Sequence, residues 1–181
     1  MTWYYTGVGS RNTPNDVLTL MGHIARKMSA FNFGQRTGDA DGADKAFRDA
    51  AYEANVFTPN WLDPMNTDWE PPIPEVYRAA DCTPQAMAIA AQFHPAWHKC
   101  SDYVRKLHGR NAFQILGLSL NDPSKYCICW TPDGCISHAT RKYQTGGTGT
   151  AISIADAYNV PVVNLAIPSH RQHWTEWLQA A

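Results

Sequence analysis

The segment TGGTGTAISIADAYNVPVVNLA, residues 145–166, joins a glycine-rich loop to a helical and then an apolar stretch, and this order decides the predicted fold. Its glycines let the chain turn sharply with free backbone N–H groups, and a helix is expected to begin at Ala151. Because the first turn of a helix has unpaired N–H donors and a positive dipole end, the loop suits a phosphate. A strand-to-helix crossover also needs such a turn for structural reasons alone. With an apolar strand predicted over residues 160–167, the segment favours an α/β sheet.

Two further strand–loop–helix units are predicted in the first third of the chain. The first has a strand over residues 3–6, the loop GVGSRNTP and a helix over about 14–30 with apolar residues at helical spacing. The second has a strand over about 33–37, the loop TGDADGAD and a helix that turns Phe47 and several alanines inward. The acids of that loop suit a turn and a helix start as well as ribose hydroxyls. Together the units predict a parallel sheet flanked by helices.

The middle of the chain departs from this alternation. Residues 58–74 are dense in Pro and Trp without a clear period, which predicts a long ordered loop whose Trp61 and Trp69 either anchor it or stack on a base. Three helical pieces are predicted next, over 84–93, over 96–107 and in GRNAFQILGLSL, followed by the buried strand KYCICWT. The tail SHRQHWTEWLQAA reads as a short amphipathic helix. We therefore expect a single domain over 1–181 with a loop and helical insertion at about 58–118.

Composition limits the classes of function. The chain has 181 residues with 44% hydrophobic content, enough for one well-buried core. A formal net charge of -1 gives no bulk attraction to nucleic acid or to a membrane. The N-terminus lacks the pattern of a secretory signal and no apolar run is as long as a membrane span, so we expect a cytoplasmic protein that contacts no membrane.

Cysteine and histidine give little reason to expect a metal. The five cysteines are an odd number, which predicts reduced thiols. The stretch CICWTPDGC invites a zinc interpretation, but a C-x-C pair lacks the usual knuckle spacing, and buried cysteines commonly pack as small apolar residues. In HPAWHKC, His94 and His98 share a predicted helix face without a further ligand nearby. We expect no metal and no cofactor.

Four fragments taken in order resemble the SLOG superfamily, which joins the DprA/Smf DNA-processing proteins, the lonely guy (LOG) hydrolases and the YspA/YpsA-like proteins. The fragments are GVGSR, TGDADGAD, GRN and the glycine loop of residues 145–150. The resemblance implies a Rossmann-like sheet whose strand-end loops form one pocket for a nucleotide derivative. The ligand-binding residues that it implies are Gly9, Ser10, Arg11, Gly38, Asp41, Asp44, Arg110, Asn111, Gly146, Gly147, Thr148, Gly149 and Thr150.

The glycine loop departs from the lonely-guy pattern P-G-G-x-G-T-x-x-E, in which the Glu takes part in cleaving the N-glycosidic bond. Here Thr145 replaces the Pro and Ser153 replaces the Glu. A hydroxyl cannot supply the negative charge that stabilises an oxocarbenium-like transition state, so hydrolysis requires another acid. Asp156 is expected to point too far round the helix, which leaves Asp41 or Asp44.

Three functions follow from these residues. The first is a protein that binds a small nucleotide derivative as a sensor or a sequestering protein, which would suit a phage or a bacterium. The second is a nucleotide N-glycosidase that uses Arg110 and an Asp. The third is a DprA-like single-stranded DNA-binding protein, against which the near-neutral charge argues. The resemblance also implies a homodimer built from the helices of residues 84–118.

Overall fold

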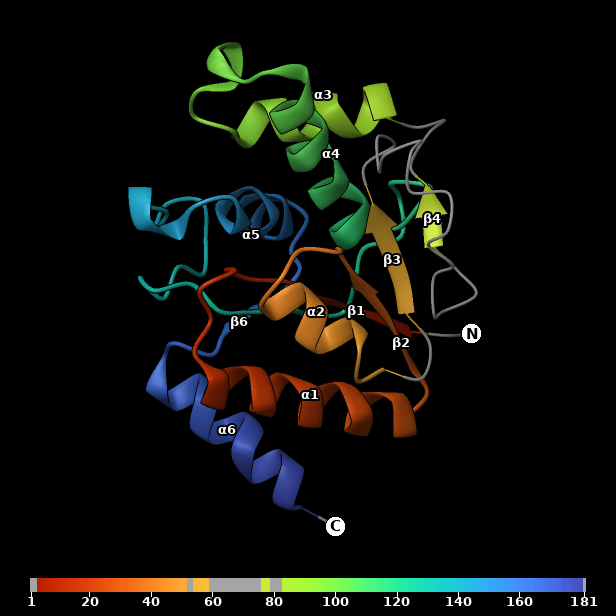
Figure 1. Ribbon diagram of the computed structural model, residues 1–181, viewed down its shortest axis with the longest axis vertical. Helices are drawn as coiled ribbons and strands as arrows, with labels where there is room; N and C mark the ends of the chain where they lie inside the picture. Colours follow the sequence, from red (N-terminus) through yellow and green to blue (C-terminus); the bar gives the residue numbers. More distant parts are fainter. Residues whose placement is uncertain (1–2, 52–53, 59–75, 79–82, 181) are drawn as a thin grey trace.

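The computed structural model describes residues 3–51, 54–58, 76–78 and 83–180, and its centre is a parallel six-stranded sheet (Figure 1). Each pair of neighbouring strands runs parallel, and β1 pairs with β2 from Trp3 opposite Phe33 to Gly7 opposite Thr37. In sheet order the strands are β4 (Val76–Arg78), β3 (Ala54–Thr58), β2 (Phe33–Thr37), β1 (Trp3–Gly7), β5 (Cys127–Cys129) and β6 (Val162–Asn164).

The strand order makes β1 and β5 the point where the chain changes direction across the sheet. From β1 the chain moves outward through β2, β3 and β4, and it then returns to add β5 and β6 on the other side of β1. Loops that leave the carboxyl ends of β1 and β5 therefore diverge. In open α/β sheets this divergence opens the crevice in which ligands bind.

Helices cover both faces of the sheet (Figure 1). On one face Tyr5, Met21, Phe47 and Trp174 belong to one apolar cluster, and on the other Phe113 and its neighbours belong to a second. The first face carries α1 (Asn15–Ala30), α2 (Ala43–Arg48) and α6 (Pro168–Gln179), and the second carries α4 (Asp102–Leu116) and α5 (Thr148–Ala157), with α3 (Thr83–Phe93) packed on α4. The predicted fold class, a Rossmann-like parallel sheet flanked by helices, is confirmed.

The helix after the glycine loop begins earlier than predicted. Helix α5 starts at Thr148 rather than at Ala151, because Gly147 already has helical dihedral angles, with φ -63° and ψ -32°. A short 3₁₀ turn, η2 (Tyr143–Thr145), precedes it. The glycine loop is therefore partly helical, and its last three predicted ligand residues, Thr148, Gly149 and Thr150, lie inside α5.

The helical insertion is divided into helices at other residues than predicted. The expected helices over 96–107 and in GRNAFQILGLSL are mostly one helix, α4, preceded by the 3₁₀ turn η1 (Trp97–Lys99). The Ser101 hydroxyl caps α4 by accepting from the N–H of Val104, and Gly117 ends it with φ +71°. A serine N-cap and a glycine in the left-handed region are the usual boundaries of a helix.

Strands β3 and β4 were not predicted, and Thr58, the first residue of the expected loop, is the last residue of β3. The rest of that loop, residues 59–74 with Trp61 and Trp69, lies outside the described residues. The predicted final strand is shorter than expected, because Ile167 already caps α6. Within the described part of the chain, no helix has both the length and the apolar character needed to cross a membrane.

Candidate functional site

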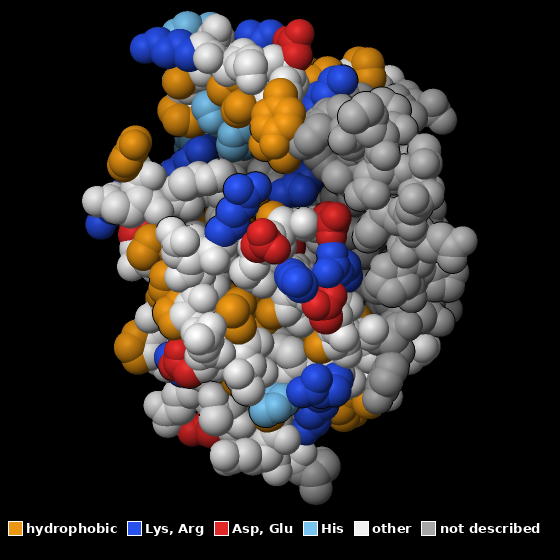
Figure 2. Space-filling view, viewed as in Figure 1, with side chains coloured by type: hydrophobic (Ala, Val, Ile, Leu, Met, Phe, Trp, Pro, Cys, Tyr) orange, Lys and Arg blue, Asp and Glu red, His pale blue; other side chains and the backbone are white. Residues whose placement is uncertain are grey.

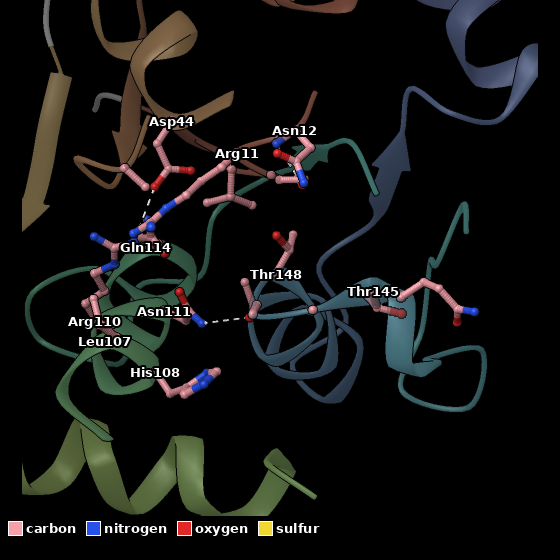
Figure 3. Close-up of a pocket in the computed structure, with 18 residues that line it drawn as sticks. Arg11, Asn12, Asp44, Leu107, His108, Arg110, Asn111, Gln114, Thr145 and Thr148 are labelled. Carbon is pink, nitrogen blue, oxygen red and sulfur yellow. Dashed lines mark hydrogen bonds and ion pairs between the residues drawn. The ribbon is translucent and has the colours of Figure 1, made fainter. Parts of the chain in front are cut away.

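A cavity of about 440 Å³ opens at the carboxyl ends of β1 and β5, between the loop after β1, the start of α2, helix α4 and the start of α5 (Figure 3). The β1 side of the cavity continues the sheet, since the N–H of Ser10 donates to the carbonyl of Trp130 at 3.1 Å. The predicted site residues that line the cavity are Gly9, Ser10, Arg11, Asp44, Arg110, Asn111, Gly146, Gly147 and Thr148.

Four predicted site residues do not line the cavity. Asp41 is exposed at the tip of its loop, and Gly38 lies behind the wall, where a Cβ would approach Gln114 Nε2 to 2.7 Å. Gly149 faces away, because its N–H donates to Gly146 at 3.2 Å and a Cβ would lie 3.0 Å from Arg141 Cδ. Thr150 is buried. The last two differ from the prediction because α5 begins at Thr148, so successive residues point to different sides of the helix.

The start of α5 forms one end of the cavity. Gly147 is the N-cap, and no backbone acceptor for its N–H is found among the described residues. Its carbonyl accepts from Asn111 Nδ2 at 3.4 Å, which ties the loop to α4. Thr145 holds the loop from below by donating its hydroxyl to the carboxylate of Asp133 and accepting from the N–H of Lys142 at 2.9 Å. These contacts position the N-terminus of α5, the positive end of its dipole, at the cavity.

Two arginines from different elements meet near one buried carboxyl group. Arg110 Nη2 on α4 lies 3.6 Å from Asp44 Oδ2 on α2, and Figure 3 shows Arg11 reaching toward the same pair from the loop after β1. Burial raises the pKa of Asp44, although Arg110 and Arg11 oppose this shift. A carboxyl group that resists ionisation neutralises two guanidinium groups only in part. This part of the cavity is therefore positively charged.

Basic and acidic side chains also gather on the surface around the cavity. Figure 2 shows Lys and Arg side chains beside acidic ones on the face between α2 and α4, with His side chains above them. One of the acidic partners is Asp39, which pairs with Arg48 of α2. Another, Asp49, lies 2.8 Å from the same guanidinium. Among the described residues, these outer acids pair with Arg48, and no ion pair joins them to Arg11 or Arg110.

Gln114 was missed by the sequence analysis, although it lines the cavity and is almost fully buried. Both atoms of its side-chain amide, and Arg110 Nε beside it, lack a hydrogen-bond partner among the described residues. A buried amide without partners costs folding free energy, so such groups usually have a ligand or water to bind. The signal that could have found it is spacing: Leu107, Arg110, Asn111 and Gln114 recur every three or four residues, on one face of α4.

His108 also lines the cavity and was not predicted. Its Nδ1 lies 3.0 Å from Thr150 Oγ1, and its ring centroid is 4.2 Å from that of His94. Burial, His94, Arg141 and Arg110, in that order, lower the pKa of His108 to about 4. The imidazole is therefore neutral at physiological pH.

The position of the lonely-guy Glu does not face the cavity. Ser153 is fully buried; its hydroxyl donates to the carbonyl of Gly149 at 2.7 Å and lies 3.0 Å from His138 Nδ1. Asp156 accepts from the N–H of His138 at 2.9 Å and does not line the cavity, as expected. Of the two acids left open by the sequence, Asp44 lines the cavity and Asp41 does not.

The cysteines and histidines form separate small groups. Cys100, Cys127, Cys129 and Cys135 are free thiols, the last three of them buried. His94 contacts Cys100, whose sulfur is 3.7 Å from Nδ1. Across the described ranges, no group of three or more His, Cys, Asp or Glu side chains has a geometry that would hold a metal ion.

Comparisons with known proteins gave no match: no family model fits the sequence, and neither a curated protein nor a solved structure is similar enough to count.

Proposed function

We propose that this protein binds a small nucleotide derivative, with a phosphate between the start of α5 and the guanidinium groups of Arg11 and Arg110 and the base toward Gln114, as a SLOG-like sensor or sequestering protein. The observation that carries the proposal is the convergence of Arg11 and Arg110 on the cavity that Gly147, the N-cap of α5, also lines. Guanidinium groups and helix N-termini are the two commonest phosphate ligands that a protein offers.

The size and polarity of the cavity support a small ligand. About 440 Å³ falls within the usual range of small-molecule sites, roughly 300–1,000 Å³. The unpartnered amide of Gln114 supplies a donor and an acceptor side by side. Such a pair complements a nucleobase edge, where donors and acceptors are also adjacent.

Binding without cleavage is favoured by the burial of Ser153, which removes the family's catalytic position from the cavity. A second function, N-glycosidic hydrolysis, is supported only by Asp44, the carboxyl group that lines the cavity. Incubation with adenosine 5′-monophosphate and chromatographic detection of adenine separates the two. We expect intact nucleotide, whereas release of adenine that stops in Asp44→Asn would establish the hydrolase.

The proposal is tested by calorimetric titration of the parent, Arg11→Ala and Arg110→Ala with adenosine 5′-monophosphate, alongside mass spectrometry of whatever co-purifies. Loss of one charge-assisted contact should cost roughly 1.5–3 kcal/mol, or about one to two decades in affinity. Arg105→Ala is the matched control, because Arg105 is also on α4 but contacts Asp102 and Trp97 outside the cavity. Unchanged affinity in both folded test variants would remove the arginines from the site.

The DNA-binding alternative is tested by salt. Affinity for a single strand falls steeply as salt rises, because each neutralised phosphate releases counterions, whereas a ligand with one or two phosphates changes much less. A steep salt dependence of oligonucleotide binding, lost in the same arginine variants, would replace the small-ligand proposal.

A further inference from the structure

His108 sits in a chain of polar contacts that links the start of α5 to the segment before it. Arg141 donates from Nη1 to the carbonyl of Phe93 at 2.7 Å, and its Nη2 lies 3.5 Å from Thr150 Oγ1. The same hydroxyl oxygen lies 3.0 Å from His108 Nδ1. Thr150 is fully buried, so these side chains rather than solvent decide where its hydroxyl hydrogen points.

The donors in this chain fix the tautomer of the imidazole. Arg141 can only donate, and the acceptor found for the buried Thr150 hydroxyl hydrogen among the described residues is His108 Nδ1, so the hydroxyl accepts from Arg141 and donates to His108. An Nδ1 that accepts belongs to a neutral ring with its proton on Nε2. The hydrogen bond of the His108 ring found among the described residues is at Nδ1, and His108 lines the cavity. The N–H of Nε2 is therefore available to a ligand.

Burial and the side chains around His108 lower its pKa and keep its ring uncharged. His94, which follows α3, lies against one face of the ring at 59°. Arg141, in the segment before η2, and Arg110, on α4 itself, add positive charge nearby and lower its pKa. Gly147 lies near the ring carbon Cε1 of His108, since a Cβ added to Gly147 would be 3.9 Å from that atom. The imidazole thus lies beside the N-cap of α5, at the proposed phosphate position.

We propose that His108 is a specificity-determining residue that donates one hydrogen bond, from Nε2 of its uncharged ring, to an oxygen of the phosphate held at the start of α5, with Thr150 and Arg141 orienting the ring. This inference rests on the proposed function. It adds a contact whose strength does not depend on the charge of the imidazole. A cationic histidine at the same place would instead strengthen anion binding as the pH falls through about 6.5.

The tautomer of His108 can be measured in the protein without any ligand. Long-range ¹H–¹⁵N correlation spectra of the parent should show His108 as a neutral ring protonated on Nε2 at neutral pH. Thr150→Val keeps the shape of the side chain and removes the hydroxyl, so the Nε2 preference should weaken. A ring protonated on Nδ1, or a cationic ring at neutral pH, would overturn the inference.

The contribution of the His108–phosphate contact to affinity is measured by titration with adenosine 5′-monophosphate. His108→Ala should bind about ten- to a hundredfold more weakly, the worth of one hydrogen bond to a charged oxygen, and His108→Gln should recover part of this loss because its amide can donate. His98→Ala is the control, since His98 is exposed on η1 and does not line the cavity. If His108→Ala binds like the parent while Arg11→Ala does not, the proposed function stands and this inference is wrong.

The pH dependence is compared between the parent and His108→Gln with sulfate, which stays doubly charged from about pH 5.5 to 8. The ratio of the two affinities should stay constant, because a neutral donor does not titrate in this range. The ratio also cancels any titration of Asp44, which both proteins share. A ratio that rises as the pH falls would overturn the neutral donor, and a parent that binds neither sulfate nor adenosine 5′-monophosphate would overturn the proposed function together with this contact.

Discussion

Replacing Gln114 with methionine should stabilise the ligand-free protein, although it removes a polar side chain from the fold. Both atoms of the Gln114 amide are buried and lack a partner among the described residues. Met has nearly the same length and volume, so the change removes two unpartnered atoms without opening a hole. Each such atom costs about 1–3 kcal/mol. At the lower end the gain is about 2 kcal/mol, which should raise the Tm by about 4–8 °C.

Gln35→Met is the matched control with the opposite expectation. Gln35 is as buried as Gln114, but its Oε1 accepts from the hydroxyl of Tyr5, which is itself buried. The substitution removes one unpartnered atom, Nε2, and leaves another, the Tyr5 hydroxyl, while losing a hydrogen bond. The net effect is a loss of about 0.5–1.5 kcal/mol.

Urea unfolding of the parent and both variants without ligand measures the two effects, and calorimetric titration with adenosine 5′-monophosphate measures the cost in binding. We expect Gln114→Met to be more stable than the parent and weaker in binding, the pattern of a side chain kept for its ligand. If Gln114→Met loses as much stability as Gln35→Met, the amide is already satisfied in the free protein. Gln114 would then not be a side chain kept for a ligand.

Three other outcomes are expected. Gly147→Val should fold, because a Cβ there has only His108 within 4 Å, at 3.9 Å, and it should lose affinity for adenosine 5′-monophosphate because the side chain enters the cavity. Gly149→Val should instead lower the Tm, because its Cβ would clash with Arg141. Equal Tm values for the two variants would contradict this. In urea unfolding from about pH 4 to 8, Asp44→Asn should gain stability over the parent as the pH rises, since a folded pKa raised by burial costs the parent stability on ionisation; a constant difference would show an ordinary pKa. Light scattering at micromolar concentration should give the mass of a homodimer, and a monomer would contradict an interface on residues 84–118.

Elements with strong local signals were predicted almost to the residue. Strand β2 matches the predicted range, and α1 begins one residue after Pro14, whose fixed φ suits a helix start. The short strands β3 and β4 were missed, because they flank a Pro-rich stretch in which no period could be recognised. What places them is pairing with β2 and with each other, which is not a local property of the sequence.

The candidate site was predictable by loop but not by side chain. The loops after β1, after β2 and before α5 do converge, as the strand order requires. Which glycine faces the cavity depends on the residue at which α5 begins. The helix begins three residues before the predicted start at Ala151, and this shift turns Gly149 toward Arg141. For Gln114 the spacing from Arg110 and Asn111 was the available signal, since by composition a polar residue that faces a cavity is indistinguishable from one that faces solvent.

The charges that favour phosphate binding also oppose cleavage of a glycosidic bond. Hydrolysis passes through an oxocarbenium-like state, in which positive charge grows on the sugar and needs a carboxylate close by. In this cavity Arg11 and Arg110 surround the lining carboxyl group, Asp44, and burial raises its pKa. The nearest negative charge is thus weakened where positive charge is already in excess. Removing Arg110 alone would not create a hydrolase, because Asp44 would lose the partner that most favours its ionisation. A bound nucleotide is therefore expected to stay intact.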